Sequence, residues 1–330
     1  MSRLLLSYAA ALLGWLSAPA AAADAPNASS SLPRYDHIVI VVEENKDYDQ
    51  IIGNPAAPYL NKLAMEGASF TRMFSEEHNS QGNYFWLFSG SNQSVGFHNM
   101  IPRDKFNTSN LGEQLIIKGL SFKGYAQSLP AIGSEVEVMP PGCRYPCRYG
   151  RKHVPWISFA NVPNGTTIAT SSNLRFEDFP ADFGDLPNVA FVIPDMDHDM
   201  HNGESTDSVA AGDLWVQTNL DGYYQWAKAH NSLLIVTFDE TQDKSGAAGL
   251  TDPANRSDPN RIATIFAGAY VKPSHAVNDR LTHVNILRTI EAIYGLPKSG
   301  AQQPLAQRAG IGDDATAGEA FVKAAPRGCP

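Results

Sequence analysis

Tyr35–Val42, with the sequence YDHIVIVV, is the stretch that decides the fold, because it ends in an unbroken run of isoleucine and valine. Such a run predicts a strand that is buried on both faces, which is typical of a parallel sheet. Similar runs follow at Asn188–Ile193, Ser232–Phe238 and Ile262–Ala267, with a shorter one at Phe122–Ala126. We therefore expect a sheet built mainly from buried strands.

Segments with helical spacing separate these runs. They lie at 57–67, 82–89, 111–118, 206–230 and 283–294, and Gly295 and Pro297 close the last one. Strands that alternate with helices predict an α/β fold with a mostly parallel central sheet and helices on both faces. Residues 130–170 have no clear period, and we interpret them as a loop-rich insertion over the sheet edge.

The first 23 residues have the character of a secretory signal peptide. Arg3 precedes a mostly apolar segment at 4–16, and Ala20–Ala23 offers a cleavage site. A membrane anchor is the weaker alternative, because a span needs about 20 unbroken apolar residues and residues such as Gly14 and Pro19 interrupt this segment. We expect an exported protein, periplasmic or secreted, after cleavage near Ala23.

The remaining chain divides by composition into three parts. Residues 24–33 are rich in Ser, Ala, Pro and Asn and predict a flexible leader. Residues 34–300 hold all the strand and helix patterns and form the expected catalytic domain. Residues 301–330 are rich in Ala and Gly and predict a loose tail. No later segment has the length and apolarity of a membrane span, so we expect no stable membrane insertion.

Net charge and cysteine content narrow the possible partners. The formal net charge is −9 and the pI is about 5.4, which argues against nucleic acid, since phosphate contacts need clustered Lys and Arg. Of three cysteines, Cys143 and Cys147 lie four apart in a loop rich in Pro and Gly. In an exported protein this spacing predicts a local disulfide. Cys329 is the third cysteine, and both a free thiol and a disulfide with another partner are open for it.

Polar groups follow three of the expected strands. Glu43, Glu44 and Asn45 come after the first, Pro194–His201 after the second, and Asp239 with Glu240 after the third. The carboxyl ends of parallel strands meet at one edge, where α/β folds bind ligands. Carboxylates gathered there repel one another unless a cation lies between them, and oxygen ligands suit a divalent metal. Solvated loop acids are the alternative for each group taken alone.

Ser80 stands just before an expected helix, in the sequence HNSQGNYFWLFSGS of His78–Ser91. The amides and the positive dipole end of that helix favour an anion such as phosphate. Taken alone, such a serine is more often a simple N-cap. The aromatic residues at 84–88 are interpreted as helix packing.

These segments together resemble the phosphoesterase family of acid phosphatases and phospholipases C, within the alkaline phosphatase superfamily. The resemblance runs from about His37 to Pro297. Its motifs, in order, are VVEEN-x-x-YDQIIGN, APYLN-x-LA, H-x-S-x-x-NY-x-x-x-SGS, KH-x-P, IPD-x-x-x-DMH, GD-x-W, TFDE and TH-x-x-x-LRTIEAIYGLP. It implies an alkaline phosphatase-like three-layer sandwich.

The resemblance also implies residue roles. Ser80 matches the nucleophile that forms a phosphoseryl intermediate, and Asn83 matches a polar residue that contacts substrate. The implied metal ligands are Glu44, Asn45, Asp239 and Glu240. The implied histidines of the phosphate pocket are His153 and His201, either of which, like His283, can protonate the leaving alcohol. Asp195 lies near these groups, with helix capping and substrate contact both open.

A second metal is also left open. The order Asp197, His201, Asp239-Glu240, His283 is similar to the ligands of two-zinc members of the superfamily. The usual Asp-His pair of those members is Asp-Glu here, which puts zinc and a second ion in doubt.

We therefore expect metal-dependent hydrolysis of phosphate esters through a phosphoserine, with Mg, Ca, Mn or Zn as the divalent ion. The leading hypothesis is an acid phosphatase-like phosphomonoesterase acting on a small phosphorylated substrate. The alternative is a phospholipase C-type phosphodiesterase that recognises a phospholipid head group. A non-catalytic periplasmic phosphate binder is a third possibility, and it would not need a nucleophile facing a metal.

Overall fold

The computed structural model describes residues 32–95, 101–144, 146–203, 205–242 and 260–322. The expected signal peptide at 1–23, most of the expected leader, and Cys329 lie outside these residues. No helix among the described residues has the length and apolarity needed to cross a membrane.

An eight-stranded sheet forms the centre of the domain, in the order β12-β2-β11-β9-β1-β8-β4-β7. Strand β1 (His37–Glu43) pairs in parallel with β9 (Ser232–Phe238) and with β8 (Val189–Ile193). Strand β8 pairs in parallel with β4 (Phe122–Ala126), and β4 with the edge strand β7 (Asn173–Arg175). The isoleucine and valine side chains of β1 are at most 1% exposed. The predicted buried, mostly parallel sheet is therefore confirmed.

The other half of the sheet contains the antiparallel pairs. Strand β11 (Thr264–Gly268) runs antiparallel to β9 and to β2 (Ala68–Phe70), and β12 (His275–Val277) completes this edge. The expected strand at Ile262–Ala267 is divided, because Ile262 belongs to β10 (Arg261–Ile262). Strand β10 joins β3 (Met73–Phe74) and β13 (Leu281–Thr282) in a separate small sheet.

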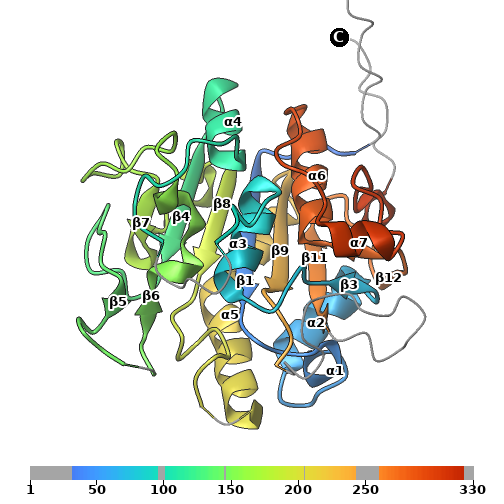
Figure 1. Ribbon diagram of the computed structural model, residues 1–330. Coiled ribbons are helices and arrows are strands. Elements are labelled where there is room, and N and C mark those ends of the chain that lie inside the picture. The colour runs from blue at the N-terminus through green and yellow to red at the C-terminus, as the bar shows by residue number, and fades with distance from the viewer. Residues whose placement is uncertain (1–31, 96–100, 145, 204, 243–259, 323–330) are drawn as a thin grey trace, which may run out of the picture. The chain divides into compact units, whose positions relative to one another are not determined.

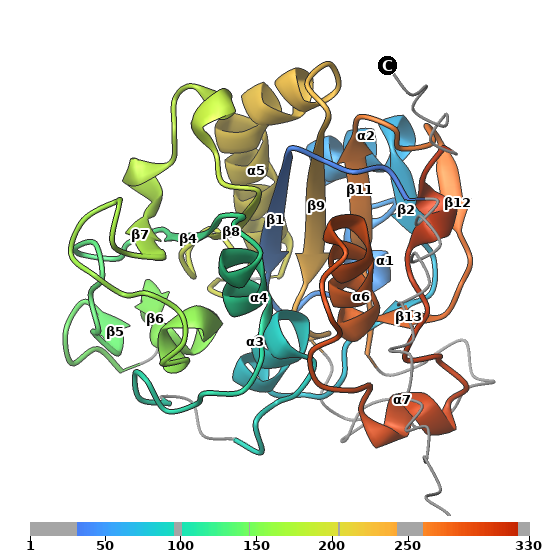
Figure 2. The same cartoon turned by 90° about the horizontal axis from the view of Figure 1, so that it is seen from above.

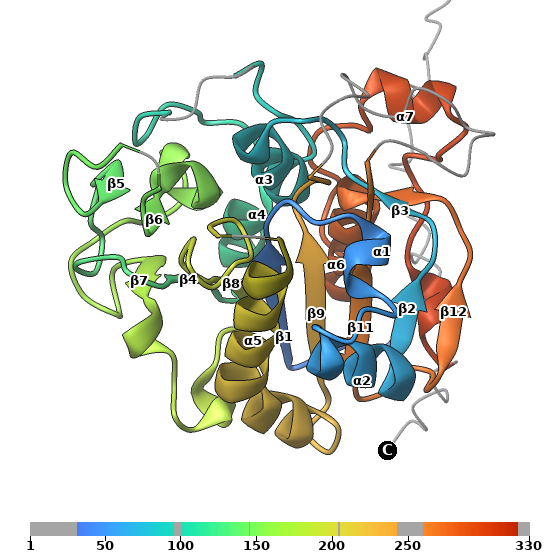
Figure 3. The same cartoon turned by 90° about the horizontal axis from the view of Figure 1, so that it is seen from below.

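Helices cover both faces of the sheet, as Figures 2 and 3 show. One face carries α3 (Ser80–Ser89), α4 (Leu111–Ile117) and α6 (His283–Tyr294). The other carries α2 (Pro58–Glu66) and α5 (Ser205–Ala227), with the short α1 (Tyr48–Ile51) nearby. Every residue of α3 is buried, so this helix is held by packing along its whole circumference. The three-layer α/β architecture expected from the sequence is confirmed.

Residues 130–170 connect β4 to the edge strand β7 and contain little regular structure. They form a hairpin of β5 (Val138–Met139) and β6 (Tyr149–Gly150), followed by short 3-10 turns at Arg151–His153 and Pro155–Ser158. A disulfide joins Cys143 to Cys147 within the hairpin loop. In Figure 1 the hairpin lies beside β4 and β7, on the flank of the sheet away from β12.

The expectation of a loose tail is wrong for residues 301–322. This segment contains α7 (Pro304–Arg308) and a 3-10 turn at Gly318–Ala320. The Phe321 ring is buried against other aromatic rings of the core. The buried Arg288 guanidinium of α6 donates to the carbonyl of Ser299 at 2.9 Å and to Asp313 at 3.1 Å. Polar contacts of Arg288 and buried apolar side chains such as Ile311 and Phe321 thus hold this segment.

Candidate active site

The carboxyl ends of three neighbouring strands bring acidic side chains together. Glu44 follows β1, Asp239 follows β9, and Asp199 lies in the loop after β8. The amide of Asn45 donates to Oδ1 of Asp239 at 3.0 Å, and the amide of Glu44 donates to the carbonyl of Asp199 at 2.7 Å. These carboxylates are buried, with at most 1% exposure each. The parallel register of β1 with β8 and β9 therefore places buried charges at one edge of the sheet.

Ser80 lies against this acidic group as the first residue of α3. Its Oγ is 3.3 Å from Oε2 of Glu44 and 3.4 Å from Oε1 of Glu240, and it donates to these carboxylates. The Ser80 side chain also interacts with Asp239. The hydroxyl therefore lies between carboxylates from two strands, at a helix N-terminus, where amides and the dipole favour an anion.

The Glu44 carboxylate is contacted by side chains from two other segments. Its Oε1 accepts a hydrogen bond of 2.8 Å from Oη of Tyr84 and lies 3.0 Å from Nε2 of His153. The Tyr84 and His153 rings stack, with centroids 5.1 Å apart. Nδ1 of His153 is 3.9 Å from Oδ2 of Asp199. Tyr84 and His153 thus fix the position of the Glu44 carboxylate.

Burial and charge act in opposite directions on these groups. Burial favours a higher pKa for Glu44, but His153, Lys152 and His201 together bring it below its usual range. Burial and the charge of Glu44 raise the pKa of Asp199 well above normal, and burial, Glu44 and Glu240 do the same for Asp239. Burial lowers the pKa of His153 to about 4, although Glu44 opposes this. The carboxylates therefore cannot all ionise easily without added positive charge.

The donor atoms fit a metal ion. Oδ1 of Asn45, Oδ2 of Asp199 and Oδ2 of Asp239 are buried and make no hydrogen bond within the protein, an arrangement that costs free energy unless a ligand satisfies it. One ligand atom from each of Glu44, His153 and Asp199 lies within 4.8 Å of the other two. This buried cluster could bind a metal. Carboxylate oxygens with one imidazole suit a divalent ion.

This cluster differs from the implied ligand set. Glu44 is common to both, and Asn45, Asp239 and Glu240 lie close by through the contacts described above. Asp199 was not among the implied ligands, and His153 was assigned to the phosphate pocket rather than to the metal. The structure therefore adds one carboxylate and one imidazole to the candidate metal site.

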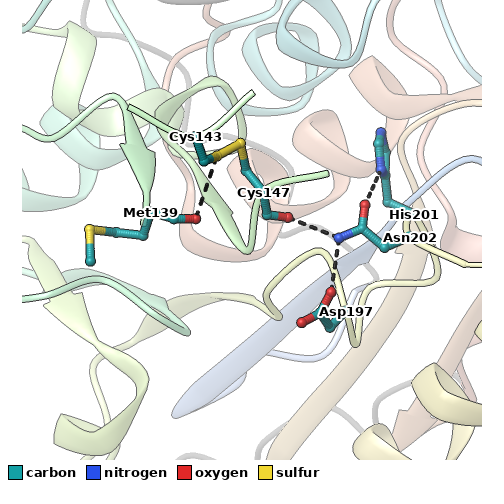
Figure 4. Close-up of a disulfide and its surroundings, with 6 residues drawn as sticks. All are labelled: Met139, Cys143, Cys147, Asp197, His201 and Asn202. Atoms are coloured by element: carbon teal, nitrogen blue, oxygen red, sulfur yellow. Dashed lines mark hydrogen bonds between the residues drawn. A yellow bond between two sulfur atoms is a disulfide. The ribbon is translucent and has the colours of Figure 1, made fainter. Parts of the chain in front are cut away.

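His201 is oriented by Asn202, as Figure 4 shows. Nδ2 of Asn202 donates to the carbonyl of Cys147 and to Oδ1 of Asp197, both at 2.9 Å. Because both partners are acceptors, Oδ1 of Asn202 must face Nδ1 of His201, 3.2 Å away. The proton of the neutral His201 ring is therefore assigned to Nδ1, and Nε2 carries the lone pair. Burial lowers the pKa of His201.

Three predicted residues have other partners. Asn83 uses its side chain on the backbone of Glu77, accepting from the amide at 3.1 Å and donating to the carbonyl at 2.5 Å. Asp195 accepts from Oγ of Ser128 at 2.6 Å and lies 2.7 Å from Nδ1 of His198. His283 is buried at the start of α6, with Nε2 2.8 Å from the carbonyl of Phe238. Asn83 and His283 thus have structural contacts that do not involve the acidic cluster.

The second metal site does not form from the expected residues. Within the described parts of the chain, ligand atoms of three His, Cys, Asp or Glu side chains converge in one place only, at Glu44, His153 and Asp199. Asp197 faces outward, 42% exposed, and pairs with Nε of Arg148 at 2.9 Å. His283 is directed to the backbone. The expected set of Asp197, His201 and His283 is therefore not brought together.

Several residues of the site were missed from the sequence. Lys46 is buried, and its Nζ donates to the carbonyls of Met200 at 2.7 Å and Asn45 at 3.2 Å. Lys152 lies close enough to influence the pKa of Glu44, His153 and His201. Tyr84 was interpreted as packing alone. The available signal was position, since Lys46 follows the EEN motif and Lys152 precedes His153.

Comparison with known proteins places these features in context. The model of the phosphoesterase family matches residues 54–297. A phosphatidylinositol-3-phosphatase from Mycobacterium tuberculosis is 42% identical over 273 residues, which cover 83% of this chain and 81% of that protein. A phosphate-repressible acid phosphatase from Penicillium chrysogenum is 29% identical over 282 residues, or 81% of this chain. The chain spans 60% of the length of that fungal relative.

Solved structures support the fold. A protein of the alkaline phosphatase superfamily from Vibrio parahaemolyticus has a TM-score of 0.54 at 13% identity, covering 86% of this chain and 70% of that one. A phosphonate monoester hydrolase from Silicibacter pomeroyi has a TM-score of 0.50 at 12% identity, covering 89% and 78%. At these identities the likeness concerns the fold alone, and it agrees with the three-layer architecture.

Proposed function

The chain belongs to the phosphoesterase family and hydrolyses phosphate esters, and from that premise we propose that it is a metal-dependent phosphomonoesterase with Ser80 as its nucleophile. One observation carries the proposal. At the start of α3, Oγ of Ser80 lies 3.3 Å from a buried carboxylate oxygen of Glu44 and 3.4 Å from one of Glu240. A hydroxyl in this position has acceptors for its proton and helix amides for the phosphate oxygens.

The proposed reaction has two displacements. Oγ of Ser80 attacks phosphorus while its proton passes to Glu240, whose Oε1 is 3.4 Å away, and the bond from phosphorus to the alcohol oxygen breaks. The alcohol leaves with a proton from the doubly protonated ring of His201. Water then attacks phosphorus and gives a proton back to His201, the bond from phosphorus to Oγ breaks, and Ser80 regains its proton from the carboxyl group as free phosphate departs. His201 is the proposed acid because Asn202 orients its ring, whereas His153 contacts the metal ligand Glu44 and His283 contacts a backbone carbonyl.

Glu44, His153 and Asp199, together with Asn45 and Asp239, would hold the divalent ion. When bound, this ion supplies positive charge that stabilises phosphate oxygens and lowers the pKa of a nearby hydroxyl. Tyr84 keeps Glu44 in place through its hydrogen bond, and Lys46 adds a buried positive charge behind the carboxylates. The chain's own residues thus supply both the ligands and their orientation.

Relatives support the class of substrate. The matched proteins are named as a phosphatidylinositol-3-phosphatase and as acid phosphatases, so a phosphomonoester is favoured over the diester of a phospholipase C. The first of these names supports a phosphorylated lipid head group as well as a small phosphate ester. We also propose export, which rests on the first 23 residues and is supported by the disulfide of Cys143 with Cys147.

Replacing the nucleophile tests the mechanism. Ser80→Ala should lower kcat on p-nitrophenyl phosphate by roughly 10⁴-fold or more, with an unchanged circular dichroism spectrum. Ser89→Ala is the matched control, because its Oγ bonds to the carbonyl of Phe85 within the same helix. Acid quenching of the unmodified enzyme should trap a phosphorylated Ser80 detectable by mass spectrometry. Retained turnover in Ser80→Ala would remove the covalent mechanism, and faster turnover of p-nitrophenylphosphorylcholine would favour the diesterase.

A further inference from the structure

We propose that a pocket beside the catalytic group binds an uncharged, apolar part of the alcohol of the phosphate ester. This inference rests on the proposed function. The pocket has a volume of about 410 Å³ and is lined by Ser128, Leu129, Pro130, Met139, Pro140 and Arg148. A volume of this size lies in the range of small-molecule sites. None of the lining residues belongs to the candidate metal cluster, so the pocket is a separate feature of the same edge of the sheet.

The register of the sheet places the pocket near Ser80 and Glu44. Tyr125 of β4 pairs with Val192 of β8, and Val192 pairs with Val41 of β1. Ser128 is three residues beyond Tyr125, just as Glu44 is three residues beyond Val41. Two spacings of about 4.8 Å separate β4 from β1, so the pocket begins roughly 10 Å from the metal cluster along this edge. With carbon–carbon bonds of about 1.5 Å, an ester whose phosphorus is at Ser80 reaches the pocket with an alkyl chain of about seven carbon atoms.

The loop after β8 joins the pocket to the catalytic group. At its start, Asp195 accepts from Ser128, and the amide of Met196 donates to the carbonyl of Arg148 at 2.7 Å. At its end the same loop carries Asp199 and His201. The pocket wall and the proposed acid are thus held by one short segment, which suits a site that binds the leaving alcohol.

The lining indicates the chemistry of the occupant. Four of the six lining residues are Leu, Pro or Met. The Ser128 hydroxyl is engaged by Asp195, and Nε of Arg148 pairs with Oδ2 of Asp197 at 2.9 Å. Because Asp197 pairs with it, Arg148 adds no net positive charge that would attract a second phosphate. Its aliphatic part instead extends the apolar wall. An alkyl or aryl group fits this lining better than a charged or polyhydroxylated one.

A series of monoalkyl phosphates from ethyl to dodecyl, with glycerol 2-phosphate as the polar reference, tests the proposal on the purified enzyme. We expect kcat/KM to rise by about fourfold for each methylene that enters the pocket and then to level off. Met139→Gln and Pro130→Asp should flatten this rise while turnover of glycerol 2-phosphate stays within about twofold. Met65→Gln is the matched control, because Met65 is 65% exposed on α2.

The outcomes separate the two proposals. A flat series in the unmodified enzyme, with every ester hydrolysed, would overturn the pocket and leave the proposed function standing. A rise that persists in both folded pocket variants would also overturn it. Hydrolysis of none of the esters would overturn the proposed function and the pocket together. Melting temperatures of Met139→Gln and Pro130→Asp establish that each variant is folded.

Discussion

Oη of Tyr84 donates a hydrogen bond of 2.8 Å to Oε1 of Glu44, and both residues are buried. Tyr84 lies four residues after Ser80 on α3. Oγ of Ser80 is 3.3 Å from Oε2, the other oxygen of the Glu44 carboxylate. One helix therefore contacts both oxygens of Glu44 through residues one turn apart. The position of the nucleophile and the orientation of the candidate metal ligand are coupled through this helix.

Tyr84→Phe should lower kcat/KM by about 10- to 100-fold, because a hydrogen bond to a charged group contributes roughly 1.5 to 3 kcal/mol. The ring and its stacking on His153 remain, so the fold should persist. Tyr59→Phe is the matched control, since its Oη donates at 2.9 Å to Asp221 on α5. Steady-state kinetics on p-nitrophenyl phosphate measure the effect. Equal losses in both variants would contradict a specific role for Tyr84.

Divalent metal should stabilise the folded protein. Burial and neighbouring carboxylates raise the pKa of Asp199 and of Asp239, and a bound cation relieves this repulsion. An ion at 100 times its Kd contributes about 2.7 kcal/mol, which raises Tm by roughly 4–5 °C in a domain of about 300 residues. Scanning fluorimetry after EDTA dialysis, with and without added Mg²⁺, Mn²⁺, Ca²⁺ or Zn²⁺, measures the shift.

Asp239→Asn should reduce the metal-dependent rise in Tm, whereas Asp36→Asn, at an exposed position before β1, should keep it. A protein whose Tm and activity are unchanged after prolonged EDTA dialysis and unaffected by all four ions would refute the metal site.

The strands were predictable because burial on both faces leaves an unbroken apolar run, as in β1, β8 and β9. Strand direction was not, since the antiparallel β11 has the same apolar character as its parallel neighbours. The position of the acidic cluster followed from strand ends meeting at one edge. Which acids of the loop 194–201 face inward did not follow, because the backbone turns between Asp195 and Asp199, whose amide donates to the Asp195 carbonyl at 2.8 Å. Asp199 is buried there and Asp197 is exposed.

Contacts between distant polar groups explain the remaining differences. Residues 301–322 are held by the Arg288 guanidinium, which binds Asp313, and by the buried Phe321 ring, and no local periodicity reveals either contact. The Asn83 side chain matches a family motif but turns back to the Glu77 backbone. Tyr84 has both a packing role and a polar role, and its ring pattern indicates only the first. Such roles depend on tertiary contacts rather than on residue type.

Glu76 should make stability depend on pH. Burial raises its pKa from 4.5 to about 7, although Thr282 and the amide of Val284 oppose this rise. The folded state then binds more protons than the unfolded state between these values, so the free energy of unfolding falls as pH rises from about 4.5 to 7 and levels off above. Glu76→Gln should remove about 2 to 3 kcal/mol of this fall between pH 5 and pH 8.

Urea denaturation of Glu76→Gln and of the unmodified protein at pH 5 and pH 8 measures the difference. Glu177→Gln, at an exposed position, should leave the pH dependence unchanged. Parallel pH profiles for Glu76→Gln and the unmodified protein would contradict the assigned shift.

Asn202→Ala should release the orientation of His201. The variant removes the Oδ1 acceptor that faces Nδ1 of His201 and the Nδ2 donor that binds Cys147 and Asp197. The ring can then carry its proton on either nitrogen, so kcat should fall about tenfold, the range of one lost hydrogen bond, while KM changes little. In the unmodified protein, the ring ¹⁵N chemical shifts of His201 should be those of the Nδ1-protonated tautomer. In Asn202→Ala they should move to values averaged over both tautomers. Asn219→Ala is the control, because its Nδ2 bonds to the Trp215 carbonyl within α5. If the His201 shifts of Asn202→Ala match those of the unmodified protein, the ring is held by other contacts and Asn202 does not position it.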